Sequence, residues 1–381
     1  MPEVVSILGG RDLTGRRLDL TARGRVLADR ETAATTIDAT GLTVAPGFVD
    51  LQVNGAYDHD FTTDPDSMWD AATRLPETGV TAFLPTLITA PDGAIPAAQA
   101  ALRRRPRDFC GAEPLGLHLE GPMISYEKRG AHPHQYLADH VSAHEWEPAS
   151  GVAMVTLAPE LPGALDAIRT LTGRGVVVSL GHSNATSAQS EAGADAGATF
   201  GTHLFNAMSL PTRSEPGLAG FLLTDRRLFF GVINDGVHVH RRLVQLMWAA
   251  AGSRLILITD ANAAMGIGDG TYQLGSLHVT VEGMVASRAD GGLAGSVLTM
   301  DQAIRNLVEF AGCSIEAAVA TATAHPAALM RLVDRGSLQN GHRADVVLLD
   351  PEAKVAGTIV GGRIAFLASP ERLTGGLHDP A

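Results

Sequence analysis

Four residues that could bind a metal ion or transfer a proton each stand at the end of a short apolar segment. Glu120 ends Leu-Gly-Leu-His-Leu-Glu, His182 follows Val-Val-Val-Ser-Leu-Gly, and Asp260 follows Leu-Ile-Leu-Ile-Thr. His203 stands in Gly-Thr-His-Leu-Phe-Asn-Ala-Met. Short apolar runs bounded by turn residues are typical of buried strands. One carboxylate and two imidazoles suit a divalent transition metal, with one position left open for water.

Asp260 is placed to act as a general base, because a bound metal lowers the pKa of its water and a nearby carboxylate can take the proton. Each of the four residues also has a purely structural interpretation. Glu120 could pair with an arginine or lysine, Asp260 could cap a helix, and a strand-end histidine is often only hydrogen-bonded. Four such residues at the same end of four strands favour a metal-dependent active site.

Two further histidines lie on loops that would open at the same end of the strands. His132 ends Lys-Arg-Gly-Ala-His after the third strand, and His238 ends Asn-Asp-Gly-Val-His after the seventh. We expect these side chains to contact substrate and to stabilise charge in the transition state. An exposed loop histidine without a function is the alternative interpretation.

The first strand indicates how many metal ions to expect. Many barrel hydrolases place His-x-His there for a second metal, whereas this chain has Gln52 and Asn54. Neither amide replaces an imidazole as a strong transition-metal ligand. The fourth strand runs into Ala-Pro-Glu160 and supplies no bridging lysine. The sequence therefore predicts one divalent ion per chain, with zinc as the first candidate and iron or another transition metal as alternatives.

The elements that must position these residues form a regular series. Apolar strands start 23 to 38 residues apart, and most gaps hold an alanine-rich segment suited to a crossover helix. This spacing predicts an α/β fold, a (β/α)₈ TIM-like barrel, with a doubly wound open sheet as the competitor. The eight predicted strands are Phe48–Val53, Thr81–Ile88, Leu115–Glu120, Ala153–Ala158, Val176–His182, Thr199–Phe205, Phe229–Asp235 and Leu255–Ala261. The predicted helices include Asp66–Leu75, Leu165–Leu171, Ser187–Ala194, Arg241–Ala251, Met300–Ala311 and Ile315–Ala324.

Both ends of the chain contain short alternating segments instead. We expect residues 1–46 and 337–381 to build one small β-sandwich domain, and residues 47–336 to form the barrel. Glycines separate short alternating pieces between residues 267 and 292, which predicts a β-hairpin insertion after the eighth strand.

Composition limits the partners and the compartment. The chain has 381 residues, is 45% hydrophobic and carries a net charge of −12. This charge argues against a general nucleic-acid or membrane binder, although a local site can still bind an anion. Its two cysteines, Cys110 and Cys313, stand apart, and no signal peptide or spanning helix is visible. We therefore expect a cytoplasmic enzyme that acts on a small molecule.

The combined motifs resemble the N-acetylglucosamine-6-phosphate deacetylases of the amidohydrolase superfamily. The resemblance runs from about residue 40 to about residue 350. It rests on Pro46-Gly-Phe-Val-Asp-Leu-Gln-Val-Asn-Gly55, His118-Leu-Glu-Gly-Pro122, Lys128-Arg-Gly-Ala-His132, Gly181-His-Ser183, His203-Leu-Phe-Asn-Ala-Met208, Asp235-Gly-Val-His238, Thr259-Asp-Ala261 and Gly295-Ser-Val-Leu-Thr-Met300.

The resemblance implies a role for each matching residue. Glu120, His182 and His203 would bind the metal, and Asp260 would be the general base and acid. His132 would help to polarise the acetyl carbonyl and His238 would contact the sugar. Further substrate contacts are expected at Asn206 and Ala207, which match phosphate-binding positions, and at Gln52 and Asn54, which match the single-metal branch of the family. Members form homodimers, and an arginine of the neighbouring subunit commonly reaches the phosphate.

One departure from the family pattern concerns that arginine. Family members usually have Arg-Glu-Pro-Gly after the Asn-Ala-Met motif, whereas this chain has Thr212-Arg-Ser-Glu-Pro-Gly217. Ser214 takes the usual slot, so we expect Arg213, one residue away, to serve the phosphate across a dimer interface. The alternatives are a deacetylase of a galactosamine-type or unphosphorylated sugar, and a non-catalytic sugar-phosphate sensor.

Overall fold

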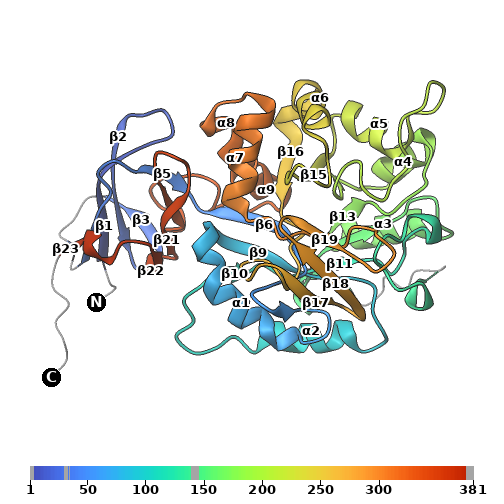
Figure 1. The fold of residues 1–381 in the computed structure, drawn as a ribbon, viewed down its shortest axis with the longest axis horizontal. Helices are drawn as coiled ribbons and strands as arrows, with labels where there is room; N and C mark the ends of the chain where they lie inside the picture. Colours follow the sequence, from blue (N-terminus) through green and yellow to red (C-terminus); the bar gives the residue numbers. More distant parts are fainter. Residues whose placement is uncertain (1–3, 30–32, 34, 139–145, 375–381) are drawn as a thin grey trace.

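The larger part of the molecule is a barrel of parallel strands (Figure 1). The computed structural model describes residues 4–29, 33, 35–138 and 146–374. The residues of β6 (Phe48–Val53) and β9 (Val80–Leu87) are buried on both faces, which is why their sequences read as nearly continuous apolar runs. The predicted barrel is confirmed. Its eight strands are β6 (Phe48–Val53), β9 (Val80–Leu87), β11 (Leu117–Glu120), β12 (Val152–Leu157), β13 (Val177–Leu180), β14 (Phe200–Gly201), β15 (Phe229–Ile233) and β16 (Leu255–Ile258).

The ring closes between its first and eighth strands. The Asp260 N–H donates to the Gln52 carbonyl over 2.9 Å, and the Asn54 N–H donates to the Ala261 carbonyl over 2.8 Å. Earlier in the same two segments, the Asp50 carboxylate accepts a 2.6 Å hydrogen bond from the Thr259 hydroxyl. These contacts bring the C-terminal ends of β6 and β16 together. The short strand β10 (Glu113–Pro114) pairs with β9 beside the ring.

Helices surround the barrel (Figure 1). Two of them, α6 (Arg241–Ala251) and α7 (Met300–Ala311), have the predicted bounds. The helix α1 (Met68–Arg74) is shorter than predicted because 3₁₀ turns flank it at Pro65–Ser67 and Leu75–Thr78. Two others, α2 and α5, were not predicted. The described helices are α1 (Met68–Arg74), α2 (Ala94–Arg103), α3 (Ala164–Gly173), α4 (Ser187–Asp195), α5 (Gly217–Thr224), α6 (Arg241–Ala251), α7 (Met300–Ala311), α8 (Ile315–Ala320) and α9 (Ala324–Leu329). No helix of the described ranges is long and apolar enough to cross a membrane.

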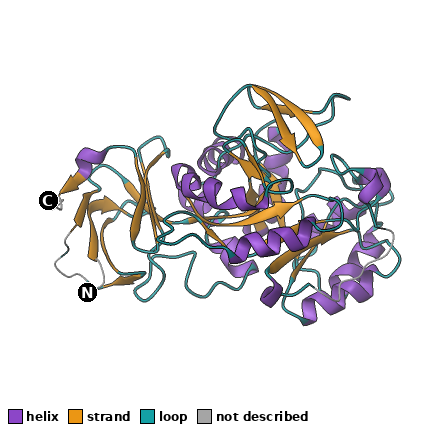
Figure 2. Cartoon of the chain, turned by 90° about the horizontal axis from the view of Figure 1, so that it is seen from below, coloured by secondary structure: helices purple, strands orange, loops and turns teal. Residues whose placement is uncertain are grey.

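The glycine-rich segment after β16 forms a small sheet that stands on one side of the barrel (Figure 2). The predicted hairpin corresponds to β17 (Gly270–Leu274) and β18 (Leu277–Glu282), and the structure adds a third strand, β19 (Val285–Ser287). We call residues 267–292 the insertion. Buried and exposed residues alternate along β18, as expected for a sheet that has one face in water.

Strands from both ends of the chain come together, as predicted, and the structure has them in one mixed sheet where a small sandwich was expected. Strand β5 (Thr43–Pro46) pairs antiparallel with β20 (Val346–Leu349), which joins the two ends. The sheet has its own apolar core, separate from the barrel core. The other strands are β1 (Val4–Arg11), β2 (Arg17–Arg23), β3 (Val26–Ala28), β4 (Thr35–Asp38), β21 (Val355–Val360), β22 (Arg363–Leu367) and β23 (Leu373–Thr374). The exact domain limits at residues 46 and 336 stay a prediction.

Candidate metal-dependent active site

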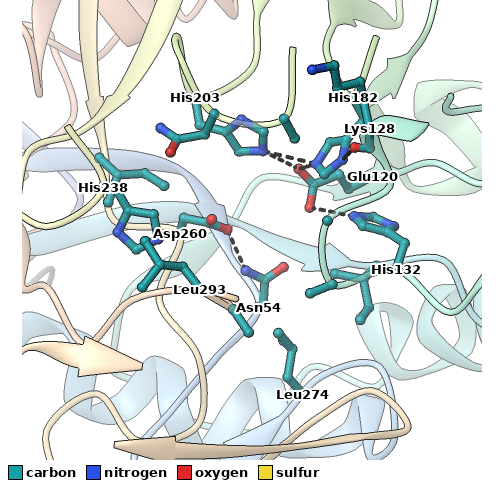
Figure 3. A pocket seen from close by; sticks show the side chains of 18 of the residues that line it. Asn54, Glu120, Lys128, His132, His182, His203, His238, Asp260, Leu274 and Leu293 are labelled. Atoms are coloured by element: carbon teal, nitrogen blue, oxygen red, sulfur yellow. Dashed lines mark hydrogen bonds and ion pairs between the residues drawn. The ribbon is translucent and has the colours of Figure 1, made fainter. Parts of the chain in front are cut away.

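Three of the predicted side chains converge at the C-terminal end of the barrel (Figure 3). Glu120 Oε1 lies 3.2 Å from His182 Nε2 and 3.0 Å from His203 Nε2, and the two Nε2 atoms are 3.1 Å apart. In a tetrahedral zinc site, bonds of about 2.0–2.1 Å put neighbouring ligand atoms about 3.3 Å apart. The three atoms therefore have the mutual spacing of ligands on one ion.

The hydrogen bonds of His182 fix its tautomer. Its Nδ1 lies 2.8 Å from the Lys128 carbonyl oxygen, which can only accept, so Nδ1 carries the proton. Nε2 is then left with its lone pair, which is the state required of a metal ligand. His203 Nδ1 is buried and has no partner among the described residues. Both imidazoles thus present Nε2 to the same point, where a cation fits the donor set.

The backbone turns sharply to aim these side chains. His182, His203 and Asp260 have φ values of 49°, 27° and 49°. Residues other than glycine rarely adopt this left-handed region, and backbone strain of this kind is most common at functional sites. Each residue stands two positions after the end of a barrel strand, so the turn directs its side chain across the end of the barrel.

The centre holds ionisable side chains, Glu120 and three histidines, in the protein interior. Burial alone would raise the pKa of Glu120, but the neighbouring imidazoles of His132, His182 and His203 hold it well below its usual value. Burial also works against a charged His203, yet the Glu120 carboxylate raises the pKa of that imidazole. The centre therefore keeps an ionised carboxylate in the protein interior, as a cation-binding site requires.

Asp260 lies on another side of the same cavity and is held by two amides. Gln52 Nε2 donates to Asp260 Oδ1 over 3.0 Å and also to Glu120 Oε1 over 2.9 Å. Asn54 Nδ2 donates to Asp260 Oδ1 over 2.7 Å. Burial, followed by the negative charge of Glu120, raises the pKa of Asp260 to about 6. A carboxyl group with a pKa close to neutrality is suited to both accept and return a proton.

His132 differs from the other two histidines because a backbone N–H determines its tautomer. The Thr89 N–H donates to His132 Nδ1 over 3.1 Å, so in the neutral ring the proton sits on Nε2. Burial lowers the pKa of His132 to about 4, which keeps the ring neutral near pH 7. Its Nε2 lies 3.6 Å from Glu120 Oε2, and the ligand atoms of Glu120, His132 and His182 all lie within 4.8 Å of one another. This group marks a metal-like site, in which the protonated Nε2 of His132 is a hydrogen-bond donor.

A cavity of about 320 Å³ opens over this centre, and its volume suits a small ligand. All but two of the predicted site residues line it. Gln52 lies beneath it, against Glu120 and Asp260, and Arg213 is exposed outside it. The predicted residues that line the cavity are Asn54, Glu120, His132, His182, His203, Asn206, Ala207, His238 and Asp260.

The sequence did not indicate that the insertion reaches this cavity. Leu274 and Arg288 of the insertion line it, together with Leu293 directly after the insertion and Ile88 directly after the second strand. The Arg288 Nη1 donates to the Gly130 carbonyl, which ties the insertion to the loop that carries His132. The only local signal was the position of the insertion after a barrel strand, since loops at that end of a barrel usually form the site.

The chain is similar to known proteins over most of its length. The model of the amidohydrolase family matches residues 43–365. Human N-acetylglucosamine-6-phosphate deacetylase is 38% identical over 96% of this chain and 92% of its own length. N-acetylgalactosamine-6-phosphate deacetylase of Escherichia coli O157:H7 is 40% identical over 84% of this chain and 87% of its own. A mutant N-acetyl-D-glucosamine-6-phosphate deacetylase from Mycobacterium smegmatis, solved in complex with N-acetyl-D-glucosamine-6-phosphate, superposes with a TM-score of 0.85. It is 33% identical and is matched over 96% of this chain and 99% of that chain.

Proposed function

The chain belongs to the amidohydrolase family, and we propose that it removes the acetyl group from N-acetylglucosamine 6-phosphate. Water would cleave the amide bond, and the products would be acetate and glucosamine 6-phosphate. The observation that carries this proposal is the convergence of Glu120, His182 and His203 beside a separately held carboxylate, Asp260. A sugar-phosphate sensor has no need of that carboxylate.

Glu120, His182 and His203 would hold one divalent ion, for which zinc is the first candidate because it favours imidazole and carboxylate ligands in a tetrahedral arrangement. Such an ion supplies a Lewis acid that makes water acidic and polarises a carbonyl. Asp260 would take the proton of the attacking water and pass it to the leaving nitrogen, so that the amine departs neutral.

Other side chains would orient these groups. The His132 Nε2–H would donate to the carbonyl oxygen as negative charge develops there. Gln52 and Asn54 would hold Asp260 in place through their amide donors. His238 donates from Nδ1 to the Asp235 carboxylate over 2.6 Å, which leaves Nε2 for the sugar. Asn206 and Ala207 would receive the phosphate end of the substrate.

We also propose a homodimer, in which Arg213 of one subunit reaches the phosphate in the other. Arg213 is exposed in the single chain, so it is free to serve a neighbour. Leu243 and Leu246, on α6, are 37% and 52% exposed, and these apolar side chains are suited to an interface. We propose the cytoplasm as the compartment, because the chain has only two cysteines and they stand far apart in the sequence.

A second candidate is the galactosamine epimer of the same substrate, because the chain is 40% identical to N-acetylgalactosamine-6-phosphate deacetylase. The test is an acetate-release assay on both 6-phosphates, run after chelation and after metal is added back. We expect metal-dependent release with a higher kcat/KM for the glucosamine substrate. Preference for the galactosamine substrate would select the second candidate, and release from neither would refute both.

A further inference from the structure

One wall of the active-site cavity is apolar and is built by three segments that are far apart in the chain. Ile88 follows β9, Ala131 precedes His132, and Leu274 ends β17 of the insertion. Ile88 and Leu274 are only 4% and 2% exposed. Both belong to the apolar core of the insertion, against which Ala131 packs. The insertion core therefore continues into the wall of the active site.

This wall is tightly packed. A methyl group added at Gly275 would lie 2.9 Å from Ile88 Cδ1, so the turn between β17 and β18 sits directly against Ile88. Ile88 is also adjacent to Thr89, which holds the His132 ring. In a close-packed interior a change of even one methylene affects the packing energy, so the wall can discriminate between groups of different size that contact it.

The chemistry fixes which part of the substrate would face the wall. The carbonyl carbon of an amide has three substituents in one plane. The oxygen must face the metal-like centre and His132, and the nitrogen must face Asp260, which protonates it. Figure 3 shows Leu274 across the cavity from His182 and His203. The third substituent, the acyl alkyl group, is left to point at this side.

The same view places the sugar. His238 and Leu293 lie with Asp260 on one side of the cavity (Figure 3). The sugar is attached to the amide nitrogen, so it extends toward that side and away from Leu274. The acyl group and the sugar therefore do not compete for the apolar wall.

We infer that Ile88, Ala131 and Leu274 form an acyl pocket that limits the substrate to short N-acyl groups, with acetyl preferred. This inference rests on the proposed deacetylase function and gives the insertion a role in specificity. The three side chains select the acyl group by its length, because a longer chain would have to displace packed atoms.

The test compares kcat/KM for N-acetylglucosamine 6-phosphate and N-propionylglucosamine 6-phosphate. Discrimination of a single methylene by an apolar pocket is about 10-fold or more. Leu274→Ala should raise the propionyl-to-acetyl ratio of kcat/KM by about 10-fold, and Ile88→Val should raise it by a smaller factor. Val285→Ala is the matched control, because Val285 lies on the same insertion but is 40% exposed and does not line the cavity.

The outcomes separate this inference from the function on which it rests. The acyl pocket is refuted if the propionyl-to-acetyl ratio of kcat/KM stays at the parent value in both Leu274→Ala and Ile88→Val. An equal loss of activity on both substrates leaves this ratio unchanged and refutes the pocket in the same way. If Leu274→Ala does not fold, Ile88→Val decides alone. A parent that releases no acetate refutes the deacetylase itself, whereas an active parent with unmoved ratios refutes only the acyl pocket.

Discussion

Gln52 links the proposed base to a proposed metal ligand, and its replacement gives the sharpest test of how the site is organised. Its Nε2 donates to both Asp260 and Glu120, and the side chain is fully buried, so water does not replace the lost donor. We predict that Gln52→Leu, which keeps most of the volume, lowers kcat/KM. A hydrogen bond to a buried charged group is worth about 1.5–3 kcal/mol, which corresponds to a loss of roughly 10- to 150-fold.

The pH profile of this variant supplies a second readout. An amide donor stabilises the ionised form of Asp260, so its removal should raise a pKa that already stands at about 6. The base works only when ionised, so the acid limb of kcat/KM should move to higher pH. Asn54→Leu is the matched variant, because Asn54 contacts Asp260 but not Glu120. An unshifted profile, or metal lost in proportion to activity, would refute the positioning role.

Three further predictions concern the metal, the phosphate and the fold. His203→Ala should lose both the single bound ion and activity, as measured by elemental analysis and acetate release, and two ions per parent chain would contradict the ligand set. Arg213→Ala should raise KM about 10-fold for the phosphorylated substrate and leave unphosphorylated N-acetylglucosamine unaffected, whereas equal effects on both would move the phosphate role elsewhere. Burial raises the pKa of Asp50 to about 7, so the folded state keeps a proton that the unfolded chain loses near pH 4. The free energy of unfolding should therefore fall as the pH rises from about 4 to 7. Urea unfolding in chelator should show this slope for the parent and a flatter one for Asp50→Asn, and parallel slopes would contradict it.

The barrel could be predicted from the sequence because buried parallel strands and amphipathic helices leave local patterns. The helix Arg241–Ala251 has its predicted bounds, since only one face of it is buried. The helix α5 lacks such a pattern, because Leu218, Ala219, Phe221 and Leu222 are all buried. The helix α2 was obscured by Pro96, which the first turn of a helix tolerates because its N–H needs no partner there.

The strand-end residues of the site could be predicted for the same reason, since the ends of neighbouring parallel strands must meet. Contacts that depend on long-range closure could not. The Gln52 amide reaches Asp260 only after the first strand meets the eighth. Leu274 enters the cavity only because the insertion folds back over the barrel. No local sequence pattern indicates either of these two contacts.

Asp260 is proposed to transfer the proton in an acetamide hydrolysis at this site, and acetate release by metal-loaded Asp260→Asn tests this role most directly. The parent should release one acetate per N-acetylglucosamine 6-phosphate consumed. The variant should keep its fold and its metal and lose about 100-fold or more in turnover, as expected when a positioned base is removed. Turnover within a few-fold of the parent in a metal-loaded variant would contradict a proton-transfer role for Asp260.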